Sequence, residues 1–365
     1  MLRILQITDI LRIINDYTDL KNLCDTCSTF LSLKNEIYYK LNYEYSKKYY
    51  NDNIFRKYIL NKINNSIKQL HINLSFCYFV DVNVLNNVHT LNLSYCNKIV
   101  DVSALGHVHT LDLSYCNKIT DVTALKNVHN LNLSYCNKII DVSALGNVHN
   151  LNLKCCINII NVSSLGNVHI LNLKCCNIID VNALGNVHTL DLSYCVKINN
   201  VNALGNIHNL NLSCCTKINN VSALGNVHIL NLSNCDAVTD VSALGHVHTL
   251  DLSYCMNIID VNALVNVHIL NLSNCRNIFD VCALGHVHTL DLSRCNNITN
   301  VSALGNVHNL NLSYCMNIID VNALVNVHTL NLSYCNKITD ISALGNVHNL
   351  NLSNCRNIID VIVSL

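Results

Sequence analysis

The amino-acid sequence predicts an α/β solenoid, a fold in which short coils stack on one another along one axis. Three observations predict it. A stretch of about 20 residues recurs from residue 72 to the C-terminus, a short segment of each copy alternates apolar and polar residues, and one cysteine recurs at the same position of the copies. A fixed period in this range is typical of proteins whose repeats bury their apolar faces by stacking.

Residues 111–130, LDLSYCNKITDVTALKNVHN, show the repeat in a representative form. Fourteen complete copies of 19 or 20 residues and one truncated copy fill residues 72–365, whereas residues 1–71 do not repeat. The sequence therefore predicts two domains, residues 1–71 and residues 72–365. The copies begin at Ile72, Leu91, Leu111, Leu131, Leu151, Leu171, Leu190, Leu210, Leu230, Leu250, Leu270, Leu290, Leu310, Leu330 and Leu350.

Each copy opens with a predicted strand. In residues 110–114, Leu111 and Leu113 alternate with Thr110, Asp112 and Ser114, and this period of two is typical of a strand with one buried face. The rest of the copy carries apolar residues at a spacing that returns the chain around a core. A copy of this length leaves no room for an α-helix of ordinary length, so the Asp-Val-Thr-Ala-Leu segment is expected to form one 3₁₀ or helical turn.

The copies resemble leucine-rich repeats, because the pattern LxLSxCxxITDVxAL matches the strand, turn and convex segments of that family along residues 72–365. The resemblance implies a right-handed coil with a parallel β-sheet on its concave face and short 3₁₀ or turn segments on its convex side. The concave strand face is the usual recognition surface of the family. The resemblance therefore also implies a protein–protein interaction module.

Residues 1–71 are expected to form helices that cover the apolar end of the first coil, with a third helical stretch from about residue 37 to residue 63. Within them, residues 9–33, DILRIINDYTDLKNLCDTCSTFLSL, resemble an F-box. That resemblance implies a substrate-recognition subunit of a cullin-RING ubiquitin ligase that docks on a Skp-type adaptor. The alternative is an interaction scaffold in which residues 1–71 are only a helical cap. The residues expected to contact the adaptor are Leu5, Ile10, Ile13, Ile14, Leu20 and Leu23.

The chain holds 21 cysteines, and fifteen of them recur at one repeat position. A small apolar side chain with a weak S–H donor suits a buried turn in which a backbone carbonyl needs a partner, so we expect a structural ladder of free thiols. Most copies also read Asn-Leu-Ser in the strand, where a glycan would disrupt packing. Both features favour a reducing, cytoplasmic location. The ladder consists of Cys77, Cys96, Cys116, Cys136, Cys156, Cys176, Cys195, Cys215, Cys235, Cys255, Cys275, Cys295, Cys315, Cys335 and Cys355.

A histidine recurs two residues before the first leucine of most strands. We expect the rings to stack along one edge of the sheet, partly buried, and repulsion between neighbouring imidazolium ions to lower their pKa values. Two sharper interpretations remain open, a pH-responsive strip and an array of His and Cys that buffers metal ions. No residue is assigned as a specific metal ligand, and no cofactor is expected. The file consists of His89, His109, His129, His149, His169, His188, His208, His228, His248, His268, His288, His308, His328 and His348.

The side chains expected to contact a partner protein lie on the strand face or directly after it. Tyrosine suits such contacts, because it is large and rigid and has a polar tip. The pattern breaks most strongly in the copies that begin at Leu151 and Leu171, where Lys replaces Ser, Cys replaces Tyr and Ile replaces Thr or Asn. Nearby lysines can lower the pKa of a thiol, so a reactive cysteine pair is an alternative interpretation of this basic patch. The candidate contact residues are Tyr95, Tyr115, Tyr135, Lys154, Cys155, Ile170, Lys174, Cys175, Tyr194, Tyr254, Arg294, Tyr314 and Tyr334.

Composition argues against several other classes of protein. Lysine plus arginine equals aspartate plus glutamate at 23 each, so no overall positive field favours nucleic acid. No run of apolar residues is long enough to predict a membrane span. The ten glycines are dispersed singly through the repeats rather than gathered in a phosphate-binding loop, and no catalytic set stands apart from the repeats. The sequence therefore does not predict an enzyme.

Overall fold

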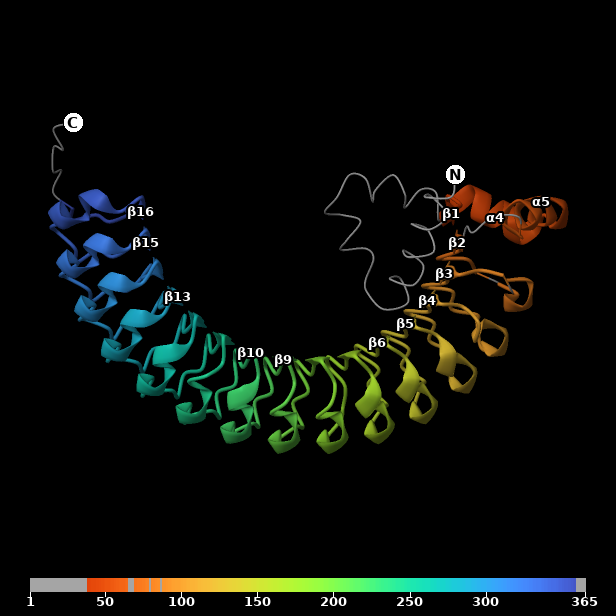
Figure 1. Cartoon of the computed structure of the whole chain (residues 1–365), viewed down its shortest axis with the longest axis horizontal. Coiled ribbons are helices and arrows are strands. Elements are labelled where there is room, and N and C mark those ends of the chain that lie inside the picture. The colour runs from red at the N-terminus through yellow and green to blue at the C-terminus, as the bar shows by residue number, and fades with distance from the viewer. Residues whose placement is uncertain (1–37, 65–68, 79, 86, 359–365) are drawn as a thin grey trace, which may run out of the picture. The chain divides into compact units, whose positions relative to one another are not determined.

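The computed structural model describes residues 38–64, 69–78, 80–85 and 87–358. The chain divides into two compact units, residues 1–136 and residues 137–365. Within the second unit, Figure 1 shows the strands along the inner side of an arc and the 3₁₀ helices along its outer side. The predicted solenoid of parallel strands with short convex turns is thus confirmed. The division of the sequence at residue 71 stays a prediction.

The first unit opens with two strands joined by two helices. Strand β1 (Tyr38–Lys40) pairs in parallel with β2 (Gln69–Asn73), and the connection holds α4 (Tyr43–Asn51) and α5 (Asn53–Asn64). The expectation of one helical stretch from about residue 37 is therefore wrong at its start, because residues 38–40 form a strand. Backbone pairing with β2 outweighs the helical spacing of the tyrosines in this segment.

Asp52 explains why the two helices are separate. Its backbone N–H donates to the carbonyl of Lys48 and so ends α4. Its side-chain Oδ1 accepts hydrogen bonds from the backbone N–H groups of Ile54, at 2.9 Å, and Phe55, at 3.0 Å, and so begins α5. An aspartate in this position is a strong helix N-cap, which the helical periodicity of the neighbouring apolar residues conceals.

Three further coils complete the first unit, each with one short strand preceded by a 3₁₀ helix. The 3₁₀ helices are η1 (Val82–Val84), η2 (Ser103–Leu105) and η3 (Thr123–Asn127). The strands are β3 (Thr90–Asn92), β4 (Thr110–Asp112) and β5 (Asn130–Asn132), and β2 to β5 pair in parallel in sequence order.

The second unit repeats this arrangement with strands β6 to β16, whose neighbours pair in parallel with no register slip; Leu230, for example, lies opposite Leu210 and Leu250. The strands are β6 (Asn150–Asn152), β7 (Ile170–Asn172), β8 (Thr189–Asp191), β9 (Asn209–Asn211), β10 (Ile229–Asn231), β11 (Thr249–Asp251), β12 (Ile269–Asn271), β13 (Thr289–Asp291), β14 (Asn309–Asn311), β15 (Thr329–Asn331) and β16 (Asn349–Asn351). The 3₁₀ helices are η4 (Ser143–Asn147), η5 (Ser163–Asn167), η6 (Asn182–Leu184), η7 (Asn202–Leu204), η8 (Ser222–Asn226), η9 (Ser242–Leu244), η10 (Asn262–Asn266), η11 (Cys282–His286), η12 (Ser302–Asn306), η13 (Asn322–Asn326) and η14 (Ser342–Asn346).

Each coil wraps around the apolar core that the repeat predicts. Burying one leucine side chain stabilises the fold by roughly 1.5–3 kcal/mol, and every interior coil contributes several such residues. These positions therefore maintain the coil and cannot contact a partner. In the coil of residues 111–130, the core residues, each at most 2% exposed, are Leu111, Leu113, Cys116, Ile119, Val122, Leu125 and Val128.

Two features hold the convex side: an aspartate side chain that accepts a hydrogen bond from the first residue of the 3₁₀ helix, and a close approach of the backbones of neighbouring coils. Asp260 Oδ1 accepts a hydrogen bond from the N–H of Asn262 at 2.9 Å, which fixes the start of η10. A Cβ added to Gly225 would lie 2.4 Å from the carbonyl oxygen of Ala243 in the next coil. Glycine at this turn therefore allows neighbouring coils to pack closely. Among the described residues, no helix is long and apolar enough to cross a membrane.

Candidate interaction face

The outer face of each strand is only partly available to a partner. In β4, Asp112 is half-buried, and its Oδ1 accepts a hydrogen bond from the N–H of Ser114 at 2.8 Å. Ser114 itself is buried. The same hydrogen bond recurs in other coils, for example between Asp251 and Ser253 at 2.9 Å. The Asn or Asp and Ser columns therefore build the turn that follows the strand, which reduces their part in recognition.

The candidate contact column lies one residue beyond that serine and adopts an unusual backbone conformation. Tyr254 has a φ of 61°, in the left-handed region, and its N–H donates to the carbonyl of Ser273 in the next coil at 2.9 Å. Cys255 N–H then donates to Leu252 O at 3.1 Å and closes the turn. The residues of this left-handed column, with φ values from 59° to 63°, are Phe76, Tyr95, Tyr115, Tyr135, Cys155, Cys175, Tyr194, Cys214, Asn234, Tyr254, Asn274, Arg294, Tyr314, Tyr334 and Asn354.

Sequence reasoning missed this conformation, although one signal was available. A non-glycine residue in the left-handed region costs about 1–2 kcal/mol, and asparagine is among the residues that tolerate it. The column holds Asn at positions 234, 274 and 354, whereas elsewhere it holds Phe, Tyr, Arg or Cys. The candidate contact residues of this column thus follow the strand instead of lying within it.

Aromatic side chains of the left-handed column stack on one another. In the first unit, the rings of Tyr95 and Tyr115 have centroids 4.2 Å apart, and the hydrogen bond that the Tyr95 hydroxyl donates to Tyr115 raises the pKa of Tyr95. In the second unit, Tyr314 and Tyr334 stack at 4.2 Å, and the Arg294 guanidinium lies 4.5 Å from the Tyr314 ring centroid. Stacking covers the ring faces, so these tyrosines present edges and hydroxyl groups.

The structure brings the predicted basic patch together on two adjacent coils of the second unit. Lys154 follows β6 and Lys174 follows β7, and Leu151 lies opposite Leu171 in the pairing of these strands. The Lys174 ammonium lies 4.9 Å from the centroid of the Tyr194 ring in the next coil. The two lysines are half-buried, whereas Ile170, at the start of β7, is 41% exposed and Tyr194 is 50% exposed.

Cys175 of this patch is not activated by the neighbouring lysines. The thiols of Cys155 and Cys175 are half-buried and share a hydrogen bond. Burial and this hydrogen bond raise the pKa of Cys175, and the opposing effect of Lys174 and Lys154 is smaller. The raised pKa keeps Cys175 protonated at neutral pH, which disfavours the reactive-thiol interpretation.

The cysteine ladder has the structural role expected of it. Cys255 is fully buried, and its Sγ donates a hydrogen bond to the carbonyl oxygen of Leu232 in the preceding coil at 3.1 Å. Burial raises the pKa of Cys255 to about 12. The same contact to the preceding coil recurs from Cys96, at 3.2 Å, to Cys355, at 3.0 Å. The described ladder cysteines are free thiols, as predicted.

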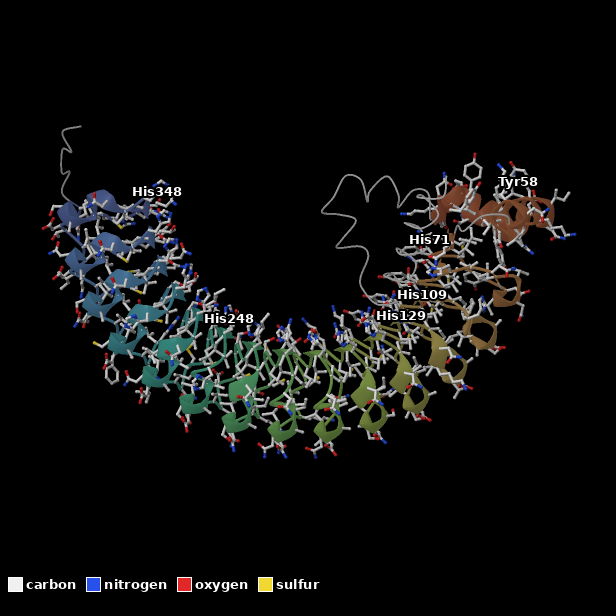
Figure 2. The ribbon with its side chains drawn as sticks, viewed as in Figure 1. Tyr58, His71, His109, His129, His248 and His348 are labelled. Atoms are coloured by element: carbon white, nitrogen blue, oxygen red, sulfur yellow. The ribbon has the colours of Figure 1, made fainter. Side chains whose placement is uncertain are left out.

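The histidines stack along the sheet as expected. In the second unit, the centroids of His248 and His268 lie 4.9 Å apart, and those of His308 and His328 lie 4.6 Å apart. Figure 2 shows His248 and His348 on the inner side of this unit, the side that carries the strands. The expected partial burial holds for His89, but histidines from position 169 onward are exposed.

Lowered histidine pKa values also appear where the structure resolves a shift. Burial, followed by the neighbouring imidazoles of His109 and His71, lowers the pKa of His89 to about 3. Desolvation and then the adjacent imidazoles lower the pKa of His248 and His288. Burial thus contributes more than the predicted mutual repulsion.

Stacking also bears on the metal-buffering interpretation. Rings that lie face to face direct their nitrogens alongside one another rather than toward a common point. Among the residues that the structure describes, no group of three or more His, Cys, Asp or Glu side chains is placed to hold a metal ion. The geometry therefore gives no support to a metal-buffering array.

The residues expected to contact a Skp-type adaptor lie outside the described part of the chain, which begins at residue 38. Leu5, Ile10, Ile13, Ile14, Leu20 and Leu23 all fall in this segment. The F-box resemblance is therefore an inference from sequence.

Comparison with known proteins places the fold. No family model and no curated protein matches the chain. Among solved structures, an internalin (InlF) from Listeria monocytogenes is 24% identical, with a TM-score of 0.57, and the match covers 78% of this chain and 87% of that one. A leucine-rich-repeat protein of Leptospira interrogans is 18% identical, with a TM-score of 0.51, and the match covers 78% of this chain and 83% of that one.

A third match concerns the functional domain of InlJ from Listeria monocytogenes, which is described as including a cysteine ladder. It is 20% identical, with a TM-score of 0.51, and the match covers 77% of this chain and 64% of that one, so this chain spans less than two thirds of it. Identities at this level show the fold alone. In fold, this chain is a leucine-rich-repeat protein.

Proposed function

We propose that this chain is an interaction scaffold that binds a partner protein with the strand face and the left-handed column of residues 137–365. The observation that supports it most is the conformation of that column. Bulky residues such as Tyr194, Tyr254 and Arg294 sit at φ values near 60°, where each costs stability, and Tyr194 and Tyr254 are 50% and 45% exposed. Backbone strain of this kind concentrates at functional sites.

The chemistry of the column favours a protein over other partners. Tyrosine and arginine are the residue types that carry much of the binding energy in protein interfaces. Tyr314 and Tyr334 cover one another's faces, which leaves little room for a sugar or base to stack between them. Equal numbers of basic and acidic residues provide no general attraction for nucleic acid.

Two exposed isoleucines allow a matched test of the binding face. Ile229 lies in β10, and Ile259 lies outside the strands, before η10. They are 36% and 53% exposed. Proteins captured by the full chain should be lost with Ile229→Lys and retained with Ile259→Lys, because only the first change places a charge on the strand face. Retention with the first and loss with the second would move the binding surface to the other side.

We propose further, on the resemblance of residues 9–33 to an F-box, that the N-terminus docks on a Skp-type adaptor of a cullin-RING ubiquitin ligase. This proposal implies a cytoplasmic protein whose strand face presents a substrate. The sequence alone supports this proposal. Two features depart from the family: Leu5 is followed by Gln6 where an F-box has Leu-Pro, and the segment before Cys27 is short. The full chain should capture a purified adaptor, and Ile10→Asp with Ile13→Asp should abolish capture. No capture by the unmodified chain would remove the ligase link.

A further inference from the structure

Two cysteines occupy neighbouring positions of the left-handed column. Cys155 and Cys175 have φ values of 59° and 61°, so their side chains leave nearly identical backbones in the same direction. The third cysteine of the column, Cys214, has Tyr194 and Asn234 as its neighbours. Cys155 and Cys175 are therefore the adjacent cysteine pair of this described column.

The backbone holds the two positions at the spacing of paired strands. The Cys155 N–H donates to the carbonyl of Lys174 at 2.8 Å, and β6 and β7 pair without a register slip just before these residues. Paired strands lie about 4.8 Å apart, within the roughly 4.4–6.8 Å over which a disulfide joins two Cα atoms. Elsewhere in the column, the rings of Tyr314 and Tyr334 stack at 4.2 Å, so side chains of adjacent coils run side by side.

The two thiols combine mutual contact with access from solvent. Cys155 and Cys175 share a hydrogen bond, and both side chains are half-buried, so a small reagent can reach them. The ladder cysteines of the same two coils differ, because Cys156 is fully buried and Cys176 is 3% exposed. The Cys176 Sγ is also engaged, since it donates a hydrogen bond to Leu153 O at 3.2 Å.

The raised pKa of Cys175 affects the rate of its reactions more than their end point. A protonated thiol reacts slowly, because the thiolate is the nucleophile. Disulfide formation within the chain also depends on how close the fold holds the second sulfur, because the second step is then intramolecular. A thiol that is not activated can thus still form a disulfide with a neighbour that the fold holds in contact.

We propose that Cys155 and Cys175 form a reversible disulfide when the chain meets a small disulfide such as oxidised glutathione. One thiol loses its proton and attacks a sulfur of the reagent, which releases one glutathione and leaves a mixed disulfide on the chain. The second thiol then loses its proton, attacks the protein sulfur of that mixed disulfide and releases the second glutathione. The protein loses two hydrogen atoms and the reagent gains them. The inference does not depend on the proposed scaffold function.

The lysines before the two cysteines allow the bond to be mapped. Trypsin cleaves after Lys154 and Lys174, so Cys155 and Cys175 become the first residues of two successive peptides, 155–174 and 175–197. The folded full chain is incubated with oxidised glutathione, unfolded in iodoacetamide to block the remaining thiols, and digested. Mass spectrometry should then find these two peptides linked, and dithiothreitol should separate them.

Single substitutions identify the cysteines that form the link. The linked peptides should be about ten-fold more abundant than any other linked pair, because the fold holds these two accessible thiols in contact. The link should disappear with Cys155→Ser and with Cys175→Ser. It should remain with Cys214→Ser, which removes the third cysteine of the column. Melting curves within about 2 °C of that of the unmodified chain show that each variant is folded.

Three results would overturn the inference. The first is the absence of the link from the unmodified chain after oxidation. The second is a link that persists with Cys155→Ser or Cys175→Ser, because the buried ladder cysteines would then form it. The third is a link that appears only when the chain is oxidised in urea, because the fold would then not bring the thiols together. None of these results bears on the scaffold function, which the Ile229→Lys variant tests.

Discussion

In the left-handed column, a single residue can favour partner binding while it lowers the stability of the fold. Tyr254 has Asn234 and Asn274 as its neighbours in the column, so its ring stacks on no aromatic residue of an adjacent coil. Its conformation costs about 1 kcal/mol more than that of an asparagine at the same φ. A tyrosine at such a position does not serve the stability of the fold. Residues of this kind are expected where function is gained at a cost in stability.

Replacing Tyr254 by Asn should therefore stabilise the fold by about 0.5–1 kcal/mol and weaken partner binding. The midpoint of urea unfolding measures the first effect. Tyr314→Asn is the control, because it also removes a stack with Tyr334 and the contact with Arg294, so no gain is expected. A loss of stability with Tyr254→Asn would show that the ring supports the coil rather than the partner.

The ladder cysteines should behave in the opposite way, since they serve only the fold. Cys255→Ala removes a buried sulfur and the second hydrogen bond of Leu232 O, which keeps only the one from Cys235 N–H, so it should cost about 1–3 kcal/mol. Cys355→Ala removes the same kind of hydrogen bond at a half-buried position and should cost less. Urea unfolding monitored by circular dichroism compares the two. An equal, small effect would mean that the ladder fills space without bonding.

Among the helices and strands, the sequence predicts those that recur in every copy of the repeat. The alternation of Leu111 and Leu113 with polar residues predicts the strand, and the length of the copy predicts the 3₁₀ helix, because both follow from local periodicity. The strand at residues 38–40 was missed, since its partner lies some thirty residues away. The left-handed turn was missed because hydrophobic pattern carries no information on φ, and only the asparagines at positions 234, 274 and 354 hint at it.

Glycine at the convex turn sets how closely neighbouring coils can pack. Gly225→Ala should destabilise the chain by about 1–2 kcal/mol, because the new Cβ would lie 2.4 Å from Ala243 O. Val265 occupies the equivalent place in another coil, so a local shift can absorb part of the cost. Gly345→Ala meets nothing within 4 Å and should leave thermal stability unchanged or slightly raised. A greater loss with Gly345→Ala would contradict this account of coil spacing.

At the scale of the whole molecule, the histidines make stability depend on pH. Their folded-state pKa values are lowered, to about 3 for His89 and about 4 for His71, whereas the unfolded value is about 6.5. Above pH 6.5 both states are neutral and pH has no effect through these groups. Below it, the unfolded chain binds more protons than the folded chain, so stability falls as pH falls toward the folded values.

The melting temperature should therefore be a few degrees lower at pH 5 than at pH 7.5. Lowered aspartate pKa values, as at Asp121 and Asp240, act below about pH 4 and leave this window to the histidines. His89→Gln should reduce the difference between the two pH values. A melting temperature that is equal at both would show that protonation of the stacked rings costs nothing.

The sequence predicts which residues of the candidate patch lie together, but not how their side chains pack. It places Lys154, Cys155, Lys174 and Cys175 on neighbouring coils, because the period fixes the register. It does not reveal that burial would raise the pKa of Cys175, nor that Lys174 would lie on Tyr194, because both depend on side-chain packing between coils. The sequence predicts the identity of the partner even less. The residues that recur most regularly are buried in the core, where a partner cannot contact them.

Photo-crosslinking can show directly whether a partner protein binds along the left-handed column. p-Benzoylphenylalanine would replace Tyr194, which is 50% exposed in the column, or Phe279, which is 61% exposed outside the strands. Both changes exchange one large aromatic side chain for another. Covalent adducts with a partner should form from position 194 and not from position 279. Adducts from position 279 alone would contradict binding along the column.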